Sequence, residues 1–118
     1  MSRTILITGS NGLLGQKLVH LLKQKNQVVA TSLGSCLISD QSDFIYQSLN
    51  VTDEKNILRI FKKYKPDFVI NTAAMTNVDA CEDDKELCEK INVTAVNYLS
   101  KACEKYNTHL TVSYTHLT

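Results

Sequence analysis

Short runs of apolar and strand-forming residues alternate along the chain with longer segments in which apolar residues recur at helical spacing. The short runs are apolar without a strict alternation of sides, which is typical of strands buried on both faces of a sheet. We therefore expect five strands, near residues 4–8, 28–31, 44–46, 68–70 and 110–112.

Three helices are expected between these strands. The first begins near Leu14 and closes at about Lys25, and the second is capped by Asp53 and ends before Pro66. The third is expected over residues 79–105, with an apolar inner face. Strands and helices thus alternate along the whole chain.

This order of elements predicts one α/β domain over residues 1–118. Strands that alternate with helices form a parallel sheet, and the right-handed crossover rule favours a Rossmann-type doubly wound order. The pattern stops after the fifth strand, before the helix and sixth strand that would complete such a sheet. We therefore expect the N-terminal part of a single Rossmann-type domain that is incomplete after the fifth strand.

A glycine-rich loop is expected between the first strand and the first helix. Residues 8–15 read Thr-Gly-Ser-Asn-Gly-Leu-Leu-Gly. Gly9 permits a tight turn, Gly12 lets the backbone approach a pyrophosphate, and Gly15 lets the helix pack against the strand. The helix N-terminus would then face the phosphates. A Walker-type loop is excluded, because Gln16 stands where its lysine is required.

The end of the second strand bears on the choice of cofactor. An acidic residue there would hold the ribose 2′-hydroxyl of NAD, and a nearby arginine would favour NADP. Residues 30–34 read Ala-Thr-Ser-Leu-Gly and contain neither. Without an acid to repel a 2′-phosphate, and with the hydroxyls of Thr31 and Ser32 able to bind one, NADP is favoured and NAD is the alternative.

The glycine spacing resembles that of the extended short-chain dehydrogenase/reductase superfamily. The stretch Asn-Thr-Ala-Ala-Met-Thr-Asn-Val-Asp at 71–79 looks like the dTDP-4-dehydrorhamnose reductase branch, as do Cys81-Glu82 and Asn92-Val93. The resemblance runs from about residue 3 to Ser113, which is nearly the whole chain. It implies that residues 1–118 are the N-terminal part of a single NAD(P)-binding Rossmann domain and that the substrate-binding C-terminal part is absent.

The resemblance implies a set of cofactor contacts. It places Gly12, Leu13 and Leu14 along the pyrophosphate and Ser32 beside the adenosine ribose. It also places Asn50 and Val51 beside the adenine, although the family usually has Asp at the first of these positions, and it places Ala74, Met75 and Thr76 by the nicotinamide half. A purely structural interpretation is also open. Val51 and Ala74 would then be core residues at a strand end, Asn50 a turn residue, and Thr31 and Ser32 residues of a solvated loop.

No catalytic residue is assigned. The family's fifth strand runs into Ser-Thr-Asp, whereas Ser113 is followed here by Tyr-Thr-His-Leu-Thr. None of the five tyrosines has a lysine four residues later, so the family's Tyr-x-x-x-Lys pair is missing. We expect residues 114–118 to be foreign to the natural sequence and these 118 residues to be inactive alone.

Composition and charge narrow the classes of function. A formal net charge of +1 lacks the basic surplus of a nucleic-acid or anionic-membrane binder. No secretory signal or membrane-spanning run is present, so a cytoplasmic location is expected. The four cysteines lack the spacing of zinc ligands, so no metal site is expected and buried thiols are the simpler interpretation.

The leading hypothesis is the cofactor-binding part of an NADP-dependent reductase that acts on a nucleotide-linked 4-keto-deoxysugar. A non-catalytic NAD(P)-binding regulatory subunit of the same superfamily is the alternative, because such a subunit keeps the glycine loop and loses the Tyr/Lys pair. A small α/β domain without a ligand is a third hypothesis. The sequence does not distinguish oligomeric states.

Overall fold

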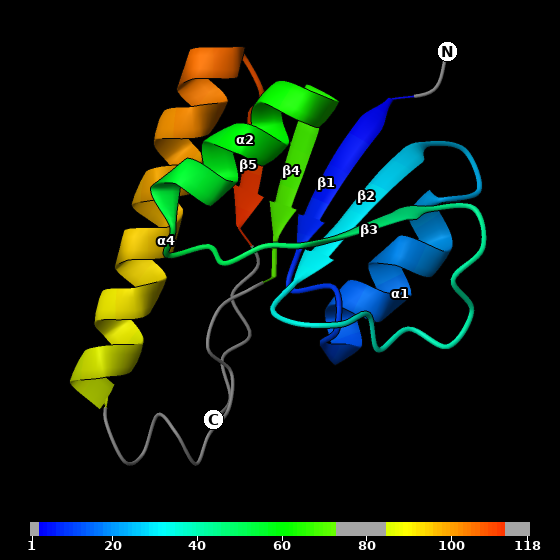
Figure 1. Ribbon diagram of the computed structural model, residues 1–118, viewed down its shortest axis with the longest axis horizontal. Coiled ribbons are helices and arrows are strands. Elements are labelled where there is room, and N and C mark those ends of the chain that lie inside the picture. The colour runs from blue at the N-terminus through cyan, green and yellow to red at the C-terminus, as the bar shows by residue number, and fades with distance from the viewer. Residues whose placement is uncertain (1–2, 73–84, 113–118) are drawn as a thin grey trace.

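The computed structural model describes residues 3–72 and 85–112. Its centre is a five-stranded parallel sheet in the order β3-β2-β1-β4-β5 (Figure 1). The strands are β1 Thr4–Thr8, β2 Gln27–Ser32, β3 Ile45–Ser48, β4 Phe68–Asn71 and β5 His109–Val112. The helices are α1 Leu13–Leu22, α2 Glu54–Tyr64 and α4 Lys85–Tyr106. This order confirms the predicted Rossmann-type fold.

The sheet separates two hydrophobic cores, one on each face. Successive residues of β1 point to opposite faces, so Leu6 joins one core while Ile5 and Ile7 join the other. The first core contains Ile57 and Phe61 of α2 together with residues of α4. The second core is closed by α1, which lies on the opposite side of the sheet in Figure 1. Both faces are therefore covered, as the apolar strands predicted.

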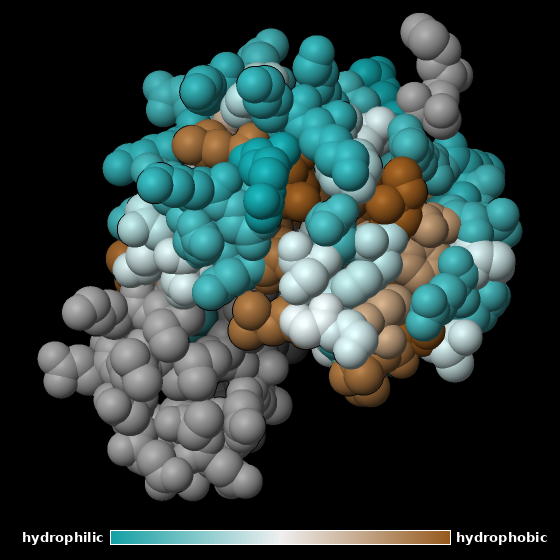
Figure 2. Space-filling view, viewed as in Figure 1, coloured by the Kyte–Doolittle hydropathy of each residue, from teal (hydrophilic) through white to brown (hydrophobic). Residues whose placement is uncertain are grey.

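The second helix shows how local sequence sets an element. The carboxylate of Asp53 accepts a hydrogen bond from the backbone N–H of Asn56, so the predicted N-cap is confirmed. Lys65 closes the helix in a left-handed conformation with φ of 47°, directly before Pro66. The exposed side of α2 is hydrophilic in the space-filling view (Figure 2). Its buried residues Ile57 and Phe61 face the sheet.

Element boundaries differ from expectation by a few residues. The first helix ends at Leu22 rather than near Lys25, because Lys23 already serves as its C-cap. The third strand begins at Ile45, one residue later than expected. The predicted start of the long helix, residues 79–84, lies outside the described residues. Among the described helices, none is long and apolar enough to cross a membrane.

Candidate functional site

The site lies where the strand order reverses. Strand β1 pairs with β2 on one side and with β4 on the other. Because all five strands are parallel, their carboxyl ends lie at the same end of the sheet. Open α/β sheets bind ligands in the crevice outside the carboxyl ends of their strands at such a switch point. The glycine loop follows β1 at this switch point.

The first and third glycines have separate structural roles. Gly9 has a φ of 74°, a conformation that residues with a Cβ rarely adopt, so the tight turn predicted there is confirmed. A Cβ on Gly15 would lie 2.3 Å from the carbonyl oxygen of Gly9 and 2.7 Å from the Cα of Ser10. Gly15 therefore lets α1 pack against the loop itself, a tighter constraint than the predicted packing against the strand.

The first turn of α1 offers backbone donors. The first hydrogen bond into the helix runs from the N–H of Gln16 to the carbonyl oxygen of Gly12, at 2.9 Å. The N–H groups of Leu13, Leu14 and Gly15 precede it and have no acceptor one turn back in the helix. Gly12 supplies no side-chain cap, and this turn carries no acidic residue. These features fit an anionic group such as a pyrophosphate.

Gly12 is not required by the fold. Its φ is −74°, which any residue adopts. A Cβ there would lie 3.4 Å from the carbonyl oxygen of Gly9, within ordinary contact distance. The fold therefore tolerates a side chain here, and the missing one leaves the backbone of Gly12 open to close approach.

Strand β4 holds the loop from one side. Thr8, Asn71 and Thr72 are linked by side-chain and backbone hydrogen bonds at the carboxyl ends of β1 and β4. Thr8 donates its hydroxyl proton to Oδ1 of the buried Asn71. The hydroxyl of Thr72 lies 2.6 Å from the carbonyl oxygen of Thr8 and 3.1 Å from that of Gly9. These contacts hold the carbonyl group of Gly9, the residue with the left-handed backbone conformation.

The two candidate hydroxyls at the carboxyl end of β2 behave differently. Thr31 is fully buried, and its hydroxyl donates to the carbonyl oxygen of Ile7 at 2.8 Å. The interpretation of Thr31 as solvated loop is therefore wrong, and its hydroxyl is already used inside the sheet. Ser32 is half-buried and is the last residue of β2, so its interpretation as solvated loop is wrong as well. Ser32 is thus the better placed of the two to meet a ligand.

Asn50 and Val51 lie beyond the end of β3. The side-chain oxygen of Asn50 accepts from the backbone N–H and the hydroxyl of Thr52, at 3.0 and 2.7 Å. Asn50 is thus a turn residue that leads into α2, as its structural interpretation predicted. Val51 is half-buried and packs against the core beneath α2. Ala74, Met75 and Thr76, the predicted neighbours of the nicotinamide, lie outside the described residues.

Two residues of the site escaped the sequence analysis. The carboxamide of Asn11 reaches the backbone of Ser35 and Leu37, and the phenol of Tyr46 reaches the carbonyl oxygens of Ser32 and Gly34. Asn11 stood inside the glycine motif, but its partners are 24 and 26 residues away in sequence. No local pattern reveals such a partner.

Ser10 combines burial with an unused hydroxyl. Its backbone N–H donates to the carbonyl oxygen of Thr31 at 2.9 Å, which ties the loop to β2. The side chain is completely buried, and its Oγ has no hydrogen-bond partner in the described part of the chain. A buried hydroxyl without a partner lowers stability.

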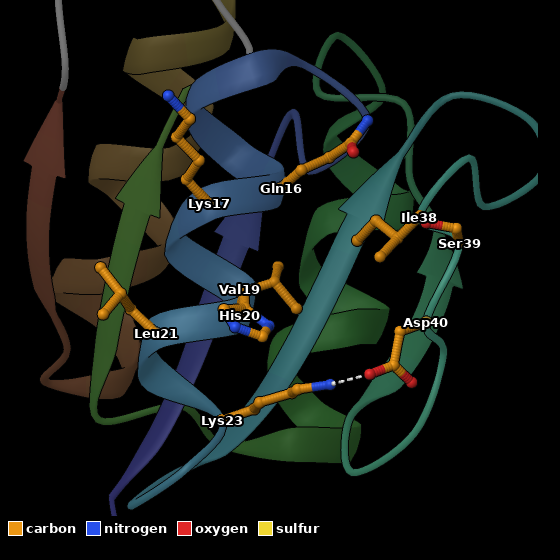
Figure 3. A pocket seen from close by; sticks show the side chains of 9 residues that line it. All are labelled: Gln16, Lys17, Val19, His20, Leu21, Lys23, Ile38, Ser39 and Asp40. Carbon is orange, nitrogen blue, oxygen red and sulfur yellow. Dashed lines mark hydrogen bonds and ion pairs between the residues drawn. The ribbon is translucent and has the colours of Figure 1, made fainter.

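A pocket of about 400 Å³ lies between α1 and the segment that follows β2. Its lining residues are Gln16, Lys17, Val19, His20, Leu21, Lys23, Ile38, Ser39 and Asp40 (Figure 3). The Nζ of Lys23 lies 3.4 Å from the carboxylate of Asp40 and donates to the carbonyl oxygen of Ser42 at 2.9 Å. Hydrogen bonds from Ser42, together with Lys23, lower the pKa of Asp40 to about 2. The pocket lies on the side of α1, and none of the three loop glycines lines it.

The cysteines that can be placed are thiols. Cys103 is buried, and burial raises the pKa of its thiol to about 11. Cys36 is half-buried in the segment after β2. Within residues 3–72 and 85–112, no group of three or more His, Cys, Asp or Glu side chains comes together in a way that could hold a metal ion.

The parallel sheet and its glycine loop define a Rossmann-type α/β unit. A sequence model of the RmlD substrate binding domain family matches residues 3–116, and the chain belongs to that family. A dTDP-4-dehydrorhamnose reductase of Burkholderia thailandensis is 35% identical over 101 residues, which are 86% of this chain and 30% of that protein. The chain spans about a third of the length of the curated relatives it matches.

Two solved structures extend the comparison. A hypothetical dTDP-4-dehydrorhamnose reductase of Sulfolobus tokodaii is 34% identical with a TM-score of 0.77, and the match covers 95% of this chain and 38% of that one. The Bordetella bronchiseptica enzyme WbmG, solved in complex with NAD, is 26% identical with a TM-score of 0.81 over 95% of this chain and 37% of that one. The relatives named here thus include two proteins described as dTDP-4-dehydrorhamnose reductases.

Proposed function

We propose that these residues form the dinucleotide-binding part of an NADP-dependent reductase that acts on a nucleotide-linked 4-keto-deoxysugar. The observation that carries the proposal is the uncapped first turn of α1, which follows the Gly9 turn at the switch point of the sheet. The N–H groups of Leu13 and Leu14 would hold the pyrophosphate there, and Gly12 would let it come close. Family membership supports the same assignment.

The nicotinamide, when bound, supplies the hydride that reduces the C4 carbonyl of the sugar. The residues of this chain bind and orient the cofactor: the loop at the pyrophosphate, Ser32 at the adenosine ribose, and Ala74, Met75 and Thr76 beside the nicotinamide half. The substrate contacts and the Tyr/Lys pair would come from protein beyond these 118 residues. Under this proposal the 118 residues bind cofactor and do not turn over substrate.

We propose NADP as the preferred cofactor, with NAD as the alternative. No acidic residue stands at residues 30–34 to repel a 2′-phosphate, and the half-buried Ser32 offers a hydroxyl at that place. The WbmG complex shows that a structural relative holds NAD. Fluorescence titrations with NADPH and with NADH test this preference. Equal affinities, or a higher affinity for NADH, would contradict it.

An assay of the complete natural protein tests the reaction. Incubation with NADPH and a dTDP-linked 4-keto-6-deoxy sugar should oxidise the cofactor, and this is followed by its absorbance. Saturable dinucleotide binding without any oxidation would instead favour a non-catalytic regulatory subunit. Absence of dinucleotide binding would overturn both.

A further inference from the structure

Asn11 joins the glycine loop to the segment that follows β2. Its Nδ2 donates to the carbonyl oxygen of Ser35 at 3.0 Å, and its Oδ1 accepts from the backbone N–H of Leu37 at 2.8 Å. Both ends of one carboxamide are therefore used on the same short segment. Such a two-point contact fixes the distance and the orientation of that segment relative to the loop.

The backbone of Asn11 is itself held in place. The side-chain amide of Gln16, in the first turn of α1, donates to the carbonyl oxygen of Asn11 at 2.8 Å. The next residue, Gly12, donates its N–H to the carbonyl oxygen of Gly9 at 3.0 Å. The carboxamide of Asn11 is thus mounted on the same turn that offers donors to a pyrophosphate.

Other contacts hold the segment after β2 at further points. The hydroxyl of Tyr46 lies 2.7 Å from the carbonyl oxygen of Gly34 and 3.1 Å from that of Ser32. Burial raises the pKa of this phenol above its ordinary value, which keeps the hydroxyl protonated and able to donate. At the far end, Lys23 donates to the carbonyl oxygen of Ser42, and Ile38 is buried in the core beneath α1.

We propose that Asn11 is a positioning residue that sets residues 33–37 beside the glycine loop before any cofactor binds. In Rossmann folds the carboxyl end of the second strand meets the adenosine ribose, while the loop after the first strand meets the pyrophosphate. Asn11 forms a direct side-chain link between these two segments. A segment ordered in advance does not have to be ordered by the ligand, so affinity rises. The ligand in this inference rests on the proposed function.

Asn11→Ala tests the inference, and Asn26→Ala is its matched control. Asn26 also donates its Nδ2 to a backbone carbonyl, that of Leu22 at 3.0 Å, but at the opposite end of α1. We expect Asn11→Ala to speed amide hydrogen exchange at Leu37 and to weaken NADPH binding, each by about fivefold or more, as the loss of one or two such bonds implies. Asn26→Ala should change neither by more than about twofold.

Asn11→Asp is the second variant, for the case in which Asn11→Ala does not fold. It keeps the acceptor for the Leu37 N–H and loses the donor to Ser35, so exchange at Leu37 should stay slow. Unchanged exchange at Leu37 in Asn11→Ala, wild-type affinity in that variant, or equal losses in Asn26→Ala would each overturn the inference. If the wild type binds neither NADPH nor NADH, the proposed function fails, and exchange at Leu37 still decides whether Asn11 holds the segment.

Discussion

The carbonyl oxygen of Gly9 lies 2.3 Å from the position that a Cβ on Gly15 would occupy. This contact brings the first turn of α1 directly against the loop that precedes it. The donors of that turn consequently lie beside the left-handed turn at Gly9, whose φ is 74°. Gly9 and Gly15 thus both serve the structure of the loop and helix, whereas the fold does not require a glycine at position 12.

Gly15→Ala should destabilise the fold. The new methyl group would meet backbone atoms of Gly9 and Ser10, which cannot move aside as the end of a side chain can. Overpacking of this kind costs about 1–3 kcal/mol or more in the free energy of unfolding. Urea denaturation followed by circular dichroism measures the change. A variant as stable as the wild type would show that α1 can shift without cost.

Gly12→Ala is the matched control for Gly15→Ala, and we expect it to change cofactor affinity rather than stability. A Cβ there meets only the carbonyl oxygen of Gly9, at 3.4 Å, and the backbone conformation suits alanine. Stability should change by less than about 1 kcal/mol, whereas NADPH affinity should fall by about tenfold, because the methyl group occupies the space proposed for the pyrophosphate. Calorimetric titration provides the affinity. Unchanged affinity would remove Gly12 from the site.

Ser10→Ala should leave the protein as stable as the wild type or more stable by about 1 kcal/mol. The hydroxyl is completely buried and has no partner in the described part of the chain, so its removal ends a desolvation penalty. The backbone bond from Ser10 to Thr31 is unaffected. Thermal unfolding of the two proteins measures the difference. A loss of more than about 1 kcal/mol would show that the hydroxyl has a partner after all.

Asp40→Asn should lower the melting temperature slightly, and the difference should depend on pH. Hydrogen bonds from Ser42 and the nearby Lys23 lower the pKa of Asp40 to about 2. A lowered pKa means that the ionised form stabilises the folded state above the ordinary pKa, and that this contribution is lost as pH falls through about 2. Melting curves of both proteins between about pH 7 and pH 2 should therefore converge at the acidic end. A constant difference would contradict this assignment.

The sequence predicted what depends on nearby residues and missed what depends on distant ones. The strand order, the turn at Gly9 and the cap at Asp53 follow from local pattern and from general rules of connection. The interpretation of Thr31 as a solvated loop residue was wrong. Near the end of a strand, a shift of one residue decides whether a hydroxyl points into the sheet or away from it. The contacts of Asn11 and Tyr46 join segments that are 12–26 residues apart, and no local pattern encodes them.

Titration of the purified 118-residue chain with NADPH, followed by fluorescence and repeated with Gly12→Ala, tests the central claim most directly. We predict saturable binding of about one dinucleotide per chain, weakened by the substitution without loss of the folded state. A folded wild-type chain that binds neither NADPH nor NADH would contradict the claim that the glycine loop holds a dinucleotide.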